Sequence, residues 1–166
     1  MMVSLDALLR SRDERSARQK ELLAAFPGCS LVCLTVIVPG EVKRTRESLI
    51  VAGAGVAELT GRFAGGLKHA EFRDLETGYE AYFVLPQKAS EVKAVCCSIE
   101  ENHPLGRLMD IDVLGTDALP LERSAIGLPP RKCLICGREA RVCMRLGAHG
   151  RAELEAKIKQ MINAYV

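Results

Sequence analysis

The stretch from His103 to Leu114, HPLGRLMDIDVL, places two carboxylates, Asp110 and Asp112, two residues apart in an otherwise apolar segment. Residues i and i+2 of a β-strand point to the same side, so a strand here would present both carboxylates on one face. The apolar residues that alternate with them would then face a core: Met109, Ile111 and Val113. The alternation therefore predicts a strand with one apolar face and one acidic face.

Two carboxylates at this spacing repel each other, and such repulsion raises a carboxyl pKa unless a cation compensates. Mg²⁺ does this readily, because it binds through one or two carboxylates together with substrate phosphates. Just before the strand, Gly106 would let the backbone approach a phosphate, and Arg107 would bind it. A glycine turn followed by an Asp-x-Asp strand is typical of nucleotidyltransferase active sites, where metal ions clamp the attacking and leaving oxygens. We expect Asp110, Asp112 and Arg107 to be catalytic; an edge strand with a solvated face is the alternative.

A second group of chemically active residues lies in RKCLICGREARVCMRLGAHG, with the spacing Cys133-x2-Cys136-x6-Cys143-x5-His149. Three cysteines and one histidine form a known ligand set of structural zinc. The segment thus predicts a possible zinc site. Three buried thiols with a surface histidine, or a metal-free group beside the active site, would use the same residues.

Arginine and histidine side chains supply further candidates for substrate binding. Arg12 and Arg15 fall at i and i+3 of a predicted helix, so they share a face that could clamp phosphates. Ion pairs of Arg10 with Glu14 and of Glu14 with Arg18 would be a structural explanation for the same charged helix. His103, which precedes Pro104, would cap a turn or contact the substrate.

The elements that must position these residues follow from the pattern of apolar residues. It predicts helices over residues 4–26, 45–63 and 152–166, and strands over 29–38, 68–75, 78–85, 90–101 and the last half of 103–114. This order predicts one α+β domain over residues 1–166, in which a mixed β-sheet flanked by helices contains a nucleotidyltransferase-like active-site strand.

Composition restricts the class of protein. The 166 residues suffice for a core without disulfides, and seven cysteines, an odd number, favour thiols or metal ligands. A net charge of +2 and the absence of Trp argue against a nucleic-acid partner. No apolar stretch approaches the length of a membrane helix and the N-terminus lacks a signal-peptide core, so we expect a cytoplasmic protein without a membrane partner.

Five segments in this order resemble the apo-citrate lyase phosphoribosyl-dephospho-CoA transferase family, also called holo-citrate lyase acyl-carrier-protein synthases. They are SRDERSARQ, LTVIVPGEVK, HPLGRLMDIDVL, LPPRKCLIC and ARVCMRLGAH. The resemblance covers nearly the whole chain, although residues 45–90 match loosely. Met109 departs from the family, in which an aromatic residue is expected at that position.

The resemblance implies a defined reaction. The family transfers the phosphoribosyl-dephospho-CoA group from 2'-(5''-triphosphoribosyl)-3'-dephospho-CoA to a serine of the citrate lyase gamma subunit, an acyl carrier protein, and diphosphate leaves. Magnesium held by Asp110 and Asp112 would serve this chemistry, with Arg107 at the leaving group and Gly106, Arg12, Arg15 and His103 toward the substrate. Transfer to another carrier, such as that of malonate decarboxylase, and a nucleic-acid-binding zinc knuckle are the alternatives.

Overall fold

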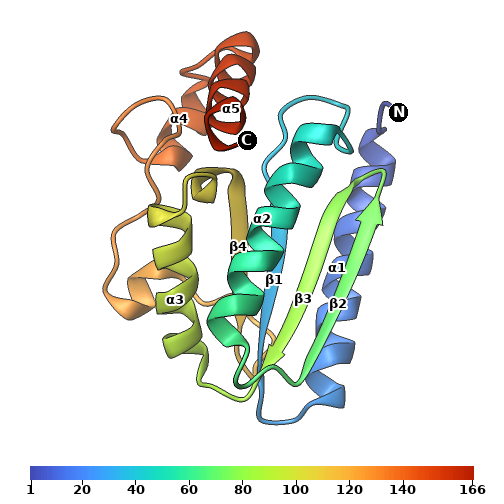
Figure 1. The fold of residues 1–166 in the computed structure, drawn as a ribbon. Coiled ribbons are helices and arrows are strands. Elements are labelled where there is room, and N and C mark those ends of the chain that lie inside the picture. Colours follow the sequence, from blue (N-terminus) through green and yellow to red (C-terminus); the bar gives the residue numbers. More distant parts are fainter.

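The computed structural model describes residues 1–166 as five helices and four strands (Figure 1). The helices are α1 (Leu5–Ala25), α2 (Arg46–Phe63), α3 (Ala89–Asn102), α4 (Ala140–Leu146) and α5 (Arg151–Tyr165). The strands are β1 (Ser30–Val36), β2 (His69–Leu75), β3 (Gly78–Leu85) and β4 (Met109–Leu114). The side chains of Ser4 and Thr45 accept backbone N–H groups at the starts of α1 and α2, as N-caps do.

The strands form one sheet in the order β2-β3-β1-β4. The sequence of elements from β1 to β4 is β-α-β-β-α-β, the split arrangement of ferredoxin-like folds. The α+β class is confirmed. All three pairings are antiparallel, however, whereas the predicted mixed sheet requires a parallel pair. Strands β1 and β2, which α2 connects, run parallel, and so do β3 and β4, which α3 connects. In each pair, however, another strand lies between the two members.

The predicted strand over residues 90–101 is wrong, because this segment is helix α3. Its main apolar contacts with the core come from Val92, Cys96 and Ile99, which recur at helical spacing. Valine, cysteine and isoleucine also suit strands, so the residue types favoured the wrong element.

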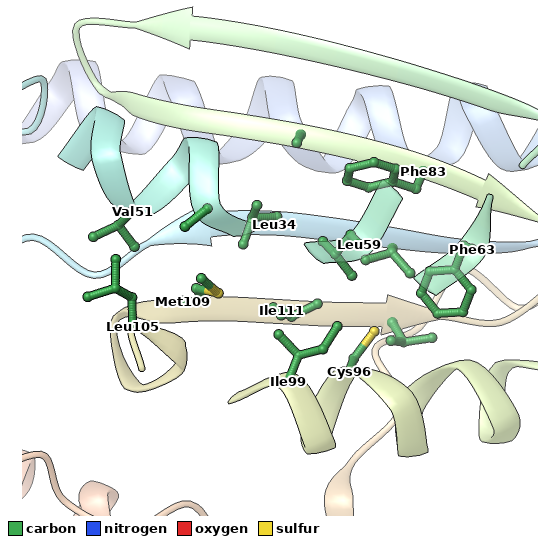
Figure 2. Packing of buried hydrophobic residues seen from close by; sticks show 14 of the residues in the cluster. Leu34, Val51, Leu59, Phe63, Phe83, Cys96, Ile99, Leu105, Met109 and Ile111 are labelled. Atoms are coloured by element: carbon green, nitrogen blue, oxygen red, sulfur yellow. The ribbon is translucent and has the colours of Figure 1, made fainter. Parts of the chain in front are cut away.

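Helices α2 and α3 cover one face of the sheet, and α1 covers the other (Figure 1). The larger core cluster lies between the sheet and helices α2 and α3, where Met109 and Ile111 of β4 contribute to it (Figure 2). Met109 is fully buried, so its side chain has a packing role. Strand β4 is thus anchored by its apolar face, and its acidic face turns away from this core.

Candidate active site

Asp110 and Asp112 lie on the same face of β4, as predicted, because burial alternates along the strand. They stand opposite Thr35 and Cys33 of β1 and on the side of the sheet that α1 covers. Both carboxylates line a cavity of about 840 Å³, and the side chain of Asp110 is 53% exposed. The pair is therefore accessible to a ligand.

The electrostatics of Asp112 favour a bound cation. Its pKa is raised, mainly because the surrounding protein reduces the hydration of the carboxylate and also because Asp110 is close. The positive charges of Lys93 and Arg15 oppose this effect without cancelling it. A divalent ion at the pair would supply the missing compensation.

The outer edge of β4 is covered by side chains instead of another strand. The Nη2 group of Arg131 donates to the carbonyl oxygen of Met109 at 2.6 Å and to those of Gly106 and Arg107 at 3.2 and 3.0 Å. At Ile111, the backbone N–H donates to Glu100 at 3.0 Å, and the carbonyl accepts from the Nζ of Lys93 at 3.4 Å. Edge groups that would otherwise be unpaired are thereby satisfied.

A buried carboxylate links these side chains to the aspartates. Glu100 is 4% exposed, and its Oε2 lies 2.6 Å from Arg123, while its Oε1 lies 3.5 Å from Arg131. The same Nη1 atom of Arg131 lies 3.7 Å from Asp110. Arg131 thus contacts the backbone of the strand, the buried Glu100 and one of the two aspartates.

Arg107 lines the same cavity and forms no ion pair. Its pKa is lowered by burial and by the neighbouring charges of Arg131 and Arg123. An anionic ligand would relieve this repulsion, so the cavity combines a cation-binding carboxylate pair with an unpaired guanidinium group.

Sequence reasoning assigned no role to Arg131, Glu100, Lys93 or Arg123. Arg131 lies in the LPPRKCLIC segment, and this was the only signal for it. Lys93 and Glu100 fall at i and i+7 of α3, on one face of that helix. That relation is invisible when residues 90–101 are interpreted as a strand.

Two of the predicted substrate-binding residues have structural roles. Gly106 is buried, and a Cβ there would overlap with the carbonyl oxygens of Ile99 and Glu100, so packing alone requires glycine. The Nδ1 of His103 accepts the backbone N–H of Leu105 at 3.0 Å, which is the predicted turn cap. Neither residue lines the cavity, and their contact with substrate stays a prediction.

Arg12 and Arg15 of α1, which were predicted to bind phosphates together, lie in different surroundings. Arg15 pairs with the buried Glu80 at 3.5 Å on the sheet face of the aspartates. Arg12 is exposed, and the pKa of Lys43 is lowered by burial and by the charges of Arg151 and Arg12. The intrahelical pairs of Glu14 with Arg10 and Arg18 do not form.

The cysteine segment assembles as predicted. One ligand atom from each of Cys133, Cys136, Cys143 and His149 lies within 4.8 Å of the others. The Nε2 of His149 is buried without a hydrogen-bond partner, and its Nδ1 lies 3.4 Å from Glu153. The pKa of Cys136 is lowered to about 6 by the backbone N–H of Arg138 and by His149. The cluster could therefore hold a metal ion such as zinc, and its orphaned nitrogen fits a ligand role.

This cluster and the aspartates share one cavity, since Cys133, Cys143 and His149 also line it. Residues Arg131 and Cys133 are separated by a single residue, so the segment that carries the metal ligands also carries the side chain that holds β4. The cluster therefore lies beside the aspartates, where the metal-free alternative also placed it, so this location does not distinguish that alternative from a zinc site.

Comparison with known proteins assigns the family. The pattern of the apo-citrate lyase phosphoribosyl-dephospho-CoA transferase family matches residues 3–165. The probable apo-citrate lyase phosphoribosyl-dephospho-CoA transferase of Vibrio cholerae serotype O1 is 37% identical, with 99% of this chain and 94% of that protein aligned. Its counterpart from Streptococcus pyogenes serotype M18 is 33% identical over 98% of this chain and 87% of its own.

Protein CitXG of Haemophilus influenzae is 37% identical over 96% of this chain, which spans only 35% of that relative. None of the helices has the length and apolar character needed to cross a membrane. The chain belongs to the apo-citrate lyase phosphoribosyl-dephospho-CoA transferase family.

Proposed function

We propose that this protein transfers the phosphoribosyl-dephospho-CoA group to a serine of the citrate lyase gamma subunit, its acyl carrier protein. The donor is 2'-(5''-triphosphoribosyl)-3'-dephospho-CoA. Family membership supports this assignment, and the observation that carries the chemistry is the location of Asp110, Asp112 and Arg107 in one cavity. We expect the reaction to take place in the cytoplasm.

The reaction is of the nucleotidyltransferase type. The serine Oγ forms a bond to the α-phosphorus of the donor, the bond to the β-phosphate oxygen breaks, and the hydroxyl proton leaves to solvent or a base. Asp110 and Asp112 would hold Mg²⁺, which supplies charge neutralisation at the phosphate oxygens. Arg107 binds the leaving diphosphate, and Arg131 orients Asp110. Positioning and electrostatics then account for most of the rate.

We further propose that Cys133, Cys136, Cys143 and His149 bind a structural zinc ion. Four protein ligands close the coordination sphere, which is the mark of structural sites. Glu153 would accept from the Nδ1 of His149 and fix the ring, the usual outer-sphere arrangement.

Mass spectrometry of the carrier tests the activity. The apo-carrier is incubated with this protein and the triphosphate donor, with and without Mg²⁺. We expect a mass gain equal to the prosthetic group that requires both protein and Mg²⁺. A carrier that keeps its apo mass under all conditions would refute the proposal, and labelling without Mg²⁺ would refute the metal role.

Neither alternative is favoured. A nucleic-acid-binding zinc knuckle would not explain the accessible aspartate pair, because two carboxylates repel phosphates in the absence of metal. The carrier of malonate decarboxylase is tested in the same assay, where we expect labelling at a much lower rate than for the citrate lyase carrier.

A further inference from the structure

We propose that the outer face of α4 is the surface on which the carrier protein docks. We call Arg141, Met144 and Arg145, together with the exposed Leu146 at the end of the helix, the α4 surface. The inference deepens the proposed function, because it assumes that a protein substrate must insert a serine into the cavity of Asp110 and Asp112.

The α4 surface has no partner within the chain that covers it. Met144 is 80% exposed and Leu146 is 65% exposed, and these are among the most exposed large apolar side chains of the protein. Arg141, Met144 and Arg145 fall at i, i+3 and i+4, so they share one face of the helix. Cys143 points the other way, is buried, and belongs to the metal cluster.

The position of the α4 surface suits delivery of a side chain to the active site. Arg141 and Met144 line the same cavity as Asp110 and Asp112. Their exposed parts therefore lie at its rim. Helices α4 and α5 stand beyond the end of the sheet, and α4 lies on the side of α5 that faces away from α2 (Figure 1). A protein seated there would have its contact region next to the cavity.

Charge indicates the chemistry of the partner. Residues 131–166 contain eight basic and three acidic residues, a net charge of +5, whereas residues 1–130 contain fifteen and eighteen, a net charge of −3. Arg145 is exposed and forms no ion pair, and Arg141 has only an exposed contact with Glu122 at 3.5 Å. Such a surface fits an acidic protein that has a small apolar spot near its reactive serine.

Two substitutions test the docking surface: Met144→Glu introduces a negative charge, and Arg145→Glu reverses a positive one. We expect the KM for the carrier to rise about tenfold in each. Arg145 does not line the cavity, so Arg145→Glu should leave kcat and the KM for the triphosphate donor unchanged. The Kd of the apo-carrier, measured directly by calorimetry, should rise in parallel and depend less on salt. Lys20→Glu, an exposed unpaired residue of α1, is the matched control and should change nothing.

Unchanged melting temperature and metal content would show that the variants are folded. A carrier Kd within twofold of the wild-type value in both variants would overturn the docking surface, as would a loss of kcat at constant KM. A wild-type dimer that Met144→Glu dissociates would also overturn it, because a second copy would then cover α4. Since binding is measured without turnover, a failure of the transfer assay would refute the proposed function alone.

Discussion

Asp110 and Asp112 face the same cavity because the period of a β-strand puts them there, and they remain accessible because β4 is an edge strand. Each aspartate is flanked by cations that it does not bind tightly, such as Arg131 at 3.7 Å from Asp110. The residual negative charge at this point is what a metal-dependent transfer to a hydroxyl group requires.

Replacing Asp112 by Asn should separate activity from stability. We expect transfer to fall about a thousandfold, because a metal ion contributes several kcal/mol and about 1.4 kcal/mol is a factor of ten. The pKa of Asp112 is raised in the folded protein, so the fold disfavours the charged carboxylate. The resulting loss of stability appears as the pH rises above the unfolded-state pKa. Asn removes that cost, so the melting temperature at pH 7 without Mg²⁺ should not fall. Asp13→Asn, at an exposed site on α1, is the control.

Arg131→Lys tests whether this guanidinium positions the active-site strand. One lysine ammonium group cannot span the three carbonyl oxygens and Glu100 at once, so Asp110 should lose its orientation. We expect kcat to fall about 10- to 100-fold, as for other partners of metal ligands, and the Mg²⁺ concentration for half-maximal rate to rise. Wild-type kinetics in this variant would contradict a positioning role. Arg10→Lys is the matched control.

At the scale of elements, the segment over residues 131–150 depends on its own cluster more than on the core. Of its cysteines only Cys143 is buried, and it belongs to neither apolar cluster of the sheet. Leu134 is the one residue of the segment that packs against the larger cluster. α4 has only seven residues, fewer than an isolated helix needs for stability. We therefore expect metal ligation to be the interaction that orders this segment.

Removal of the metal should loosen this segment and leave the sheet intact. We expect about one zinc per chain, and after chelation a loss of hydrogen-exchange protection in residues 131–150 while β1 and β3 keep theirs. Cys136→Ser should give the same pattern, whereas Cys29→Ser, outside the cluster, should retain the zinc. Global loss of protection on chelation would show that the metal stabilises the whole fold.

At the scale of the whole molecule, the close packing of α2 on the sheet limits what the core accepts. A Cβ at Gly55 would lie 2.8 Å from Leu34 Cδ2 and 3.4 Å from Met109 Sδ, whereas nothing lies within 4 Å of one at Gly53. The helix therefore approaches β1 and β4 at a glycine, and the side chain of Met109 anchors β4 in the core that α2 covers (Figure 2).

Alanine at these two glycines should have opposite effects on stability. Gly53→Ala should raise the free energy of unfolding by about 1 kcal/mol, through helix propensity at an exposed site. Gly55→Ala should lower it by about 1–3 kcal/mol, because the core must shift to admit the methyl group. Urea denaturation of both variants measures the difference, and equal effects would contradict the packing described.

The sequence by itself determined which side chains of β4 share a face and which residues could form the metal cluster. Both depend on periodicity and spacing within short segments, and these are present in the sequence whatever the tertiary structure is. The sequence could not determine whether residues 90–101 form a helix or a strand. A short apolar segment suits either element, and packing against the sheet selects one.

Only the tertiary structure decided how β4, the strand of the candidate active site, is held. Arg131, Glu100 and Lys93 meet at the edge of β4 from separate parts of the chain, and no local pattern encodes such contacts. The shared cavity of the aspartates and the cysteine cluster has the same origin, since it exists only where residues distant in sequence enclose it.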